Sequence, residues 1–277
     1  MSHSWATRVP HPALRGLVTR YVGYSQDDVT LAVHRGLPSR HVTLIVSLED
    51  PIRFAFAGRE GALRGLVGGL HTAPALITQD RVQRGVHVEL DPLGVRVLLG
   101  VTAAELSGCV VDLADFGRSL PALASLPSRL HEAPDWAARF AILDSVLSSR
   151  LAGDPPPPEV GAAWRLLCHS GGSLRVSDLA SEVGWSRRHL AERFRTELGL
   201  PPKQAARVLR FERAGRLLRS AQFLDLASVA VAAGYYDQAH LSNEWRALAG
   251  CSPGTWIAEE LPFLQDPEAG AAPDSSP

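Results

Sequence analysis

The chain of 277 residues has little lysine, cysteine or methionine and no long hydrophobic run. Lys203 is the only lysine among 28 lysines and arginines, so nearly all positive charge is carried by arginine. The three cysteines, Cys109, Cys168 and Cys251, are far apart and form no C-x-x-C pair, which argues against a disulfide framework or a zinc site. The N-terminus lacks the apolar run of a signal peptide, and no apolar stretch is long enough to span a membrane. We therefore expect a cytoplasmic protein with no membrane partner.

Charge is balanced over the whole chain but not along it. The formal net charge is −1 and 45% of the residues are hydrophobic, as in an ordinary globular protein long enough for two domains. Residues 187–219 hold ten basic and three acidic residues, whereas residues 222–260 hold one basic and five acidic residues. A local excess of arginine predicts attraction to phosphate groups within the first of these segments.

One pattern occurs twice in the second half, at residues 176–199 and 226–250. Each copy predicts a short helix, a turn made by a glycine, an aromatic residue that fills the corner, and a second helix. Two copies of one supersecondary unit are the economical interpretation. The matched positions are Leu179 and Val229, Ala180 and Ala230, Gly184 and Gly234, Trp185 and Tyr235, Leu190 and Leu241, Phe194 and Trp245, Gly199 and Gly250, and Pro202 and Pro253.

The second helix of each copy has an apolar stripe and a polar remainder. Ser186 and Asp237 precede these helices and are predicted N-caps. The stripes consist of Leu190, Phe194 and Leu198 in the first copy and Leu241, Trp245 and Leu248 in the second. Between the copies, residues 202–220 predict one helix about 27 Å long at roughly 1.5 Å per residue. Such a rod could hold two helices about one DNA turn, roughly 34 Å, apart.

These features resemble the DNA-binding domain of the AraC/XylS family of bacterial transcription regulators. The resemblance covers residues 162–260 and includes Arg-Phe-Glu-Arg-Ala-Gly-Arg-Leu-Leu at 210–218, Gly-Tyr-Tyr-Asp-Gln-Ala-His-Leu-Ser-Asn-Glu-Trp at 234–245 and Gly-Cys-Ser-Pro at 250–253. Leu241 and Trp245 depart from the family by replacing its usual phenylalanines. Ala191 and Glu192 stand where members often contact bases, so the target sequence does not transfer.

The resemblance implies a DNA-binding transcription regulator, acting as activator or repressor, in which both motifs enter adjacent major grooves. The implied DNA-binding residues are Ser186, Arg187, Arg188, Ala191, Glu192 and Arg195 in the first motif, and Gln238, Ala239, His240, Ser242 and Asn243 in the second. An exposed arginine is also typical of a solvated helix face, and Glu192 could pair with Arg188 or Arg195 instead of meeting a base.

The first half is predicted to be rich in antiparallel strands, as a barrel or sandwich. The predicted strands are residues 17–24, 29–33, 41–48, 52–57, 62–70, 75–78, 84–90 and 95–99, followed by a helical turn at 103–107 and an amphipathic helix at 134–151. Trp136, Phe140, Leu143 and Leu147 form one stripe of that helix, which we assign to the domain core rather than to a partner helix.

The predicted fold class is therefore multi-domain α+β. A β-rich regulatory, effector or dimerisation domain at 1–152 carries helices at its C-terminal end, a proline-rich linker occupies 153–159, and an all-α domain with two helix-turn-helix motifs joined by a linker helix occupies 160–262. The tail at 263–277 is predicted to be disordered. If the linker separates independent units, the chain from about residue 160 onward should fold and bind DNA by itself.

Segments 36–48, 68–74 and 94–106 look like the cupin-like regulatory domains of some AraC-type proteins, which bind a small effector or dimerise. We place the effector site inside the β-rich half, with Arg35, His41 and His71 as candidate lining residues. The partners expected are double-stranded DNA, a small effector of unknown identity, RNA polymerase and a second copy of the chain.

Metal catalysis is the alternative that a cupin-like fold raises. His87 and Glu89 lie two apart and would face one side of a strand, where His34, His41 or His71 could join them. The chain offers only this one H-x-E, so we predict no enzyme activity, no metal and no cofactor. A DNA-binding protein without an effector, whose N-terminal half only dimerises, and a cupin-type metal-dependent enzyme fused to a DNA-binding domain stay open as alternatives.

Overall fold

The computed structural model describes residues 3–149, 151, 155–220 and 225–261. The N-terminal region contains two antiparallel sheets, as the alternating patterns predicted. The larger sheet has the spatial order β1 (His3–Arg8), β2 (Val18–Asp27), β9 (Val82–Leu90), β4 (Val42–Ser47), β7 (Gly65–Gly68) and β10 (Val110–Asp112). The smaller sheet has the order β3 (Val33–Gly36), β8 (Ala75–Thr78), β5 (Ile52–Phe56) and β6 (Arg59–Leu63).

Alternation along the central strands divides the larger sheet into two faces. Val42, Leu44 and Val46 of β4 are fully buried in the hydrophobic core, while the residues between them point to the opposite face. On the neighbouring β9, Val86 and Val88 lie in the same core, and the intervening residues again face the other way. One face of this sheet therefore packs a core, and the other is available to line a cavity.

Short helices complete the β-rich region. They are a 3-10 turn η1 (Pro12–Leu14), α1 (Gly94–Leu99), α2 (Ala103–Leu106), a 3-10 turn η2 (Leu113–Phe116), α3 (Pro121–Ala124), α4 (Leu126–Glu132) and α5 (Trp136–Ser148). Phe140, Leu143 and Leu147 of α5 are buried and Trp136 is partly buried against them, so this stripe belongs to the core, as predicted.

Several sequence-based assignments in this region were wrong. Residues 95–99 form helix α1 instead of a strand, because the carbonyl of Asp91 accepts from the N–H groups of Gly94 and Val95 and starts a helical turn. The strand predicted at 62–70 is divided between β6 and β7, and the one predicted at 29–33 lies at β3. Strands β1 and β10 were missed.

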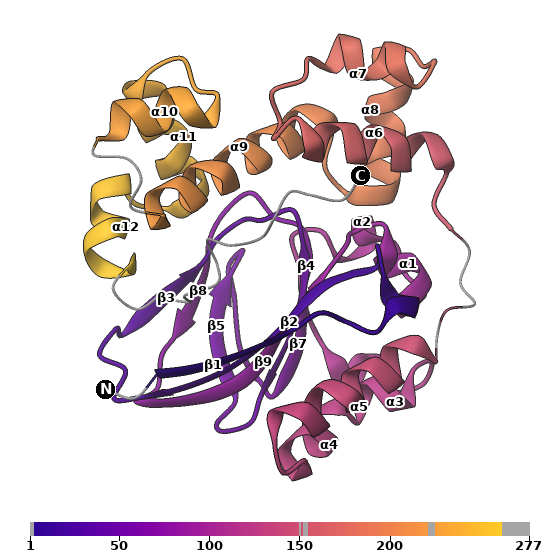
Figure 1. The fold of residues 1–277 in the computed structure, drawn as a ribbon, viewed down its shortest axis with the longest axis vertical. Helices are drawn as coiled ribbons and strands as arrows, with labels where there is room; N and C mark the ends of the chain where they lie inside the picture. The colour runs from indigo at the N-terminus through magenta and orange to yellow at the C-terminus, as the bar shows by residue number, and fades with distance from the viewer. Residues whose placement is uncertain (1–2, 150, 152–154, 221–224, 262–277) are drawn as a thin grey trace.

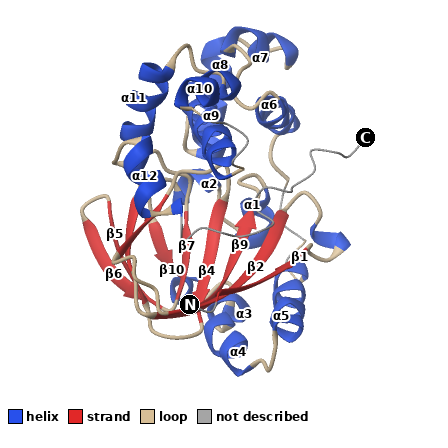
Figure 2. Ribbon diagram, turned by 60° about the vertical axis from the view of Figure 1, so that its left-hand side comes forward, coloured by secondary structure: helices blue, strands red, loops and turns tan. Residues whose placement is uncertain are grey.

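The rest of the chain is helical. It contains α6 (Pro158–His169), α7 (Val176–Glu182), α8 (Arg187–Leu198), α9 (Pro202–Arg219), α10 (Leu226–Ala233), α11 (Gln238–Ala249) and α12 (Pro253–Glu259). Helix α6 begins inside the linker predicted at 153–159, with a proline in its first turn. Residues 153 and 154 of that linker, and the tail predicted at 263–277, lie outside the described residues. Figure 1 and Figure 2 show α9 beside the sheets and α3, α4 and α5 on the opposite side.

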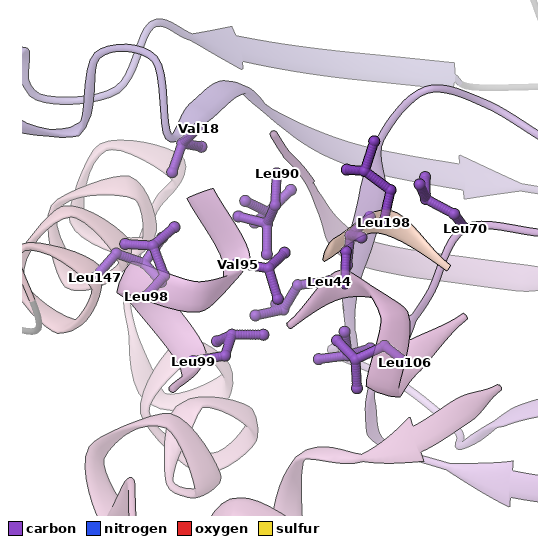
Figure 3. Packing of buried hydrophobic residues seen from close by; sticks show 14 of the residues in the cluster. Val18, Leu44, Leu70, Leu90, Val95, Leu98, Leu99, Leu106, Leu147 and Leu198 are labelled. Carbon is purple, nitrogen blue, oxygen red and sulfur yellow. The ribbon is translucent and has the colours of Figure 1, made fainter. Parts of the chain in front are cut away.

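Two hydrophobic clusters span the structure. The larger one joins the core of the β-rich region to α6, α7, α8 and the first half of α9, and includes Leu198 at the end of α8. Figure 3 shows Leu198 among residues of the β-rich region such as Leu70 and Leu106. The smaller cluster begins at Phe211 of α9 and contains the cores of α10, α11 and α12. Within the described part of the chain, no helix is long and apolar enough to cross a membrane.

Candidate DNA interface and ligand cavity

The first helix-turn-helix unit, α7 and α8, is built by local interactions. Gly184 has φ +71°, a left-handed conformation that a glycine adopts without strain. The Ser186 hydroxyl accepts from the His189 backbone N–H at 3.2 Å, which confirms the predicted N-cap. With its apolar stripe buried, α8 presents Arg187, Arg188, Glu192 and Arg195 to solvent and Ala191 half-buried between them. No ion pair of Glu192 occurs within the described residues.

The second unit, α10 and α11, repeats this construction. Gly234 has φ +85°, and the Asp237 carboxylate accepts from the His240 backbone N–H at 2.7 Å, as predicted. Tyr235 is buried at the corner, and its ring meets that of His240 edge-on at 5.2 Å between centroids. The exposed face of α11 carries Gln238, Ala239, His240 and Asn243, with Ser242 half-buried beside them.

One residue of this surface escaped the sequence analysis. Tyr236 is 89% exposed directly before the cap of α11. An exposed aromatic ring at the start of a groove-facing helix can make apolar contacts with a nucleotide. The signal was present in the sequence: the second unit has two aromatic residues after its glycine, and only the first is needed to fill the corner.

Helix α9 fixes the two units relative to one another. Its first half contributes Ala205, Ala206 and Leu209 to the larger cluster, and its second half contributes Phe211 and Ala214 to the smaller one. The Arg210 guanidinium donates to the carbonyl of Gly172 at 2.8 Å and lies 5.9 Å from the centroid of the Tyr235 ring. Arg207 pairs with Glu244 of α11 at 2.7 Å. Apolar packing thus joins α9 to the first unit, and both apolar and polar contacts join it to the second unit and to the loop before α7.

A cavity of about 520 Å³ lies between the sheets and α9. Thr43 and Ile45 of β4 and His87 and Glu89 of β9 face it, since these positions alternate with the buried core residues. Phe54, Phe56 and Ile77 of the smaller sheet supply apolar walls, and the closing face consists of Phe211, Glu212, Gly215, Arg216 and Arg219 of α9. Arg35, His41 and His71, the candidate effector residues, all line this cavity.

Two of the carboxylates that line the cavity, Glu89 and Glu212, are paired with basic groups beside α9 and β9. Glu89 accepts from Arg20 at 2.9 Å and lies 3.6 Å from His41. Burial acts to raise the pKa of Glu89, but His41 and Arg20 outweigh it and lower that pKa to about 2. Burial lowers the pKa of His41 to about 4, so its imidazole is neutral at neutral pH. Glu212, 3.8 Å from Arg40, has its pKa raised by burial.

Two arginines of α9 differ from these pairs. Within the described part of the chain, neither Arg216 nor Arg219 forms an ion pair, although both line the cavity. Burial lowers the pKa of Arg219, and its guanidinium lies 5.4 Å from the centroid of the Trp256 ring. The cavity therefore offers positive charge that no carboxylate of the described residues neutralises by direct contact.

The described residues do not supply the set of ligands that the metal-site alternative requires. The described residues contain no group of three or more histidine, cysteine, aspartate or glutamate side chains placed to hold a metal ion. Nδ1 of His34 lies 2.9 Å from a carboxylate oxygen of Glu260, and Nδ1 of His71 lies 2.6 Å from the carbonyl oxygen of Ala73. Nε2 of His87 lines the cavity, is buried and has no hydrogen-bond partner among the described residues, which makes it a polar group that a ligand could satisfy.

Comparison with known proteins assigns the helical region. Residues 179–259 match the helix-turn-helix domain family, and 116 residues are 31% identical to a protein of Streptomyces antibioticus named as an AraC-like transcription regulator. Residues 179–259 are an AraC-type helix-turn-helix domain. The match to the Streptomyces protein covers 42% of this chain and 38% of that regulator, so the likeness in sequence extends over less than half of either protein.

The whole-chain fold also has a solved counterpart. An apo ToxT variant from Vibrio cholerae strain SCE256 has a TM-score of 0.52 with 9% identity, over 91% of this chain and 99% of that one. Wild-type ToxT from the same strain with a bound unsaturated fatty acid has a TM-score of 0.50 with 12% identity, over 88% and 97%. The AraC-type domain and the β-rich region are thus arranged in a known overall fold.

Proposed function

We propose that this protein is a sequence-specific DNA-binding transcription regulator whose α8 and α11 occupy adjacent major grooves. The observation that carries the proposal is that α9 joins two capped helix-turn-helix units whose polar helix faces are exposed. At about 1.5 Å per residue, its 18 residues span about 27 Å, comparable with the roughly 34 Å turn of DNA.

The two motifs contribute different chemistry to DNA binding. Arg187, Arg188 and Arg195 give α8 an exposed cationic face suited to phosphates or to guanine. Helix α11 offers the amides of Gln238 and Asn243, which suit the edge of adenine. We assign sequence reading mainly to α11 and much of the salt-dependent affinity to α8.

We further propose that the cavity binds a small effector with an apolar body and an acidic group. Its aromatic and aliphatic walls suit an apolar body, and Arg216 and Arg219 supply cations that form no direct ion pair within the described residues, although Glu212 attracts both. A ToxT structure contains an unsaturated fatty acid, a molecule of this class. Arg35, His41 and His71 line the proposed site.

The DNA-binding proposal is tested by selecting duplexes from a random pool with the purified full chain and footprinting the enriched sequence. We expect two protected half-sites about one helical turn apart on one face of the DNA. Equal affinity for enriched and scrambled duplexes would contradict the proposal. Sedimentation of the same protein, with and without DNA, tests whether a second copy of the chain binds, as the sequence led us to expect.

The effector proposal is tested by calorimetric titration of the full chain with dodecanoate and with dodecanol, which share a chain and differ in charge. We expect dodecanoate to bind more tightly, and Arg216→Gln with Arg219→Gln to reduce that preference. Equal binding of both molecules would refute the acidic effector. Absence of binding by either, with DNA binding retained, would favour a regulator without this effector.

A further inference from the structure

The two helix-turn-helix units are attached to the β-rich region in different ways. The first is joined by apolar packing: Leu198 and Leu200 lie in the same cluster as Leu70 and Leu106. Gly199, at the end of α8, approaches so closely that an added Cβ would lie 2.3 Å from Cβ of Ser107. Separating these surfaces would expose a continuous core, so the first unit and the β-rich region are expected to move together.

The second unit has its own cluster, in which Leu37 is the one described residue of the β-rich region. Gly250, at the end of α11, also approaches Pro74, and polar contacts make a further link. Glu260, after α12, is 0% exposed and accepts from the Arg35 guanidinium at 2.8 Å, the Arg35 backbone N–H at 3.2 Å and Nδ1 of His34 at 2.9 Å. Glu259 accepts from the same guanidinium at 2.9 Å. We call His34, Arg35, Glu259 and Glu260 the clasp.

The clasp depends on its donors because the Glu260 carboxylate is buried. Burial alone would raise the pKa of Glu260, but the hydrogen bonds from His34 and Arg35 lower it, so the clasp holds a carboxylate anion. A buried carboxylate that loses such partners is strongly destabilised. It regains solvation if the end of α12 moves away from β3, so loss of the donors and release of the helix are coupled.

The same donors belong to the ligand cavity. His34 and Arg35 lie on β3 and line the cavity on the side toward α12. An acidic molecule in the cavity therefore competes with Glu260 for one guanidinium and one imidazole. Arg219 lies near both sites, since it lines the cavity and sits against Trp256 of α12.

We propose that the clasp is where an acidic effector acts: the effector takes over Arg35 and His34, Glu260 loses its partners, and the second helix-turn-helix unit is released while the first stays in place. This inference rests on the proposed function for the identity of the effector. The holding role of the clasp stands without it. Released, α10, α11 and α12 keep their own core and their covalent link through α9, and the β-rich region no longer sets their position.

The holding role is tested on the full chain by hydrogen exchange with mass spectrometry. Glu260→Gln keeps the side-chain shape and removes its charge, and Arg35→Met removes the opposite partner without altering α12. We expect both variants to accelerate exchange in α12 and the end of α11 by about tenfold or more, with α7 and α8 unchanged. The matched control is Arg96→Gln, which breaks the 3.1 Å ion pair to Glu197 of α8 at the first unit. We expect little change there, because apolar packing holds that unit.

The competition is tested by adding dodecanoate to the wild-type chain, with dodecanol as the uncharged match. We expect dodecanoate to accelerate exchange in α12 of the wild type and to add nothing in Glu260→Gln. Unchanged exchange in both clasp variants would overturn the holding role. Bound dodecanoate that leaves α12 protected would overturn the competition, while failure of dodecanoate to bind would refute the acidic effector and the competition with it, leaving the holding role decided by the two variants.

Discussion

Replacing Leu198 by alanine tests whether the β-rich region and the first helix-turn-helix unit share one core. Leu198 is 0% exposed at the end of α8 and belongs to the cluster that continues into the β-rich region. Removing such a side chain costs roughly 2–5 kcal/mol, depending on how far the cavity collapses. We expect about 3 kcal/mol, because residues from two regions surround Leu198 and neither can close the space alone.

The matched control is Leu166→Ala in α6. Leu166 is 38% exposed, so the same chemical change removes less buried surface and should cost about 1 kcal/mol or less. Thermal unfolding of both variants gives the difference. At roughly 2–4 °C per kcal/mol for a cooperative unit of this size, Leu198→Ala should lower Tm by about 6–12 °C.

Hydrogen exchange identifies which segments lose protection. A shared core requires that Leu198→Ala accelerate exchange in β7 and α2 of the β-rich region as well as in α8. The reasoning is refuted if only α7 and α8 respond, or if a chain starting near residue 160 loses as much stability from Leu198→Ala as the full chain does. That result would instead support the independent units predicted from the linker at 153–159.

Three further predictions follow from single groups. Arg187→Ala should weaken binding to every duplex and lower the salt dependence of log K by about one, whereas Gln238→Ala should cost about 1–3 kcal/mol on the selected site alone. Salt titrations on selected and scrambled DNA measure both effects. Equal losses of affinity by Gln238→Ala on the two duplexes would contradict the assignment. Burial lowers the pKa of His41 to about 4, so between about pH 6.5 and 4 the unfolded chain binds a proton that the folded chain does not. The free energy of unfolding should therefore fall by at most about 3 kcal/mol as pH drops through this range. Urea unfolding should show a shallower fall for His41→Asn, and an equal fall in both proteins would argue against this role of His41. Gly234→Ala should lower the free energy of unfolding in urea by about 1 kcal/mol because the φ of Gly234 is +85°. Gly254→Ala should leave it unchanged, because an added Cβ there meets no atom closer than 3.9 Å. Equal effects of the two substitutions would exclude backbone strain as the cause.

The AraC-type domain could be predicted closely because its signals are local. A cap, a glycine in the left-handed conformation and a stripe at helical spacing all act within one or two turns of chain. Helix α8 therefore begins directly after its predicted cap, Ser186, and the helix predicted at 202–220 differs from α9 by a single residue at its end. The residues that specify each of these elements therefore lie close together in the sequence.

The β-rich region was harder to predict because its elements depend on distant partners. The apolar segment at 95–99 suits a strand or a helix by composition. The turn at Asp91 decides between them, with its carboxylate accepting from the Leu93 N–H at 2.8 Å and its carbonyl starting α1. Strand β10 has three residues and exists because β7 pairs with it. No periodic signal of useful length arises from such a segment.

The ligand cavity was predicted only in part, because it too is formed by residues that are distant in the sequence. Arg35, His41 and His71 were placed in the β-rich half and do line its cavity, while their role stays a proposal. Arg216 and Arg219 were counted with the basic residues that attract phosphate. Their spacing fits a helix face, but only the folded chain shows that this face covers the cavity.

Helix α9 gives a physical reason to expect coupling between the cavity and the DNA-binding surface. Phe211, Gly215 and Arg219 recur at intervals of four and, with Glu212 and Arg216, form the face toward the cavity. The first half of the same helix belongs to the larger cluster and the second half to the smaller one. Arg207 binds α9 to α11, and Arg210 binds it to the loop that precedes α7. An α-helix transmits displacement along its length because its backbone hydrogen bonds resist local bending. A ligand that contacts the second half of α9 therefore acts directly on the element that spaces α8 and α11, and the clasp determines how far α10, α11 and α12 can respond.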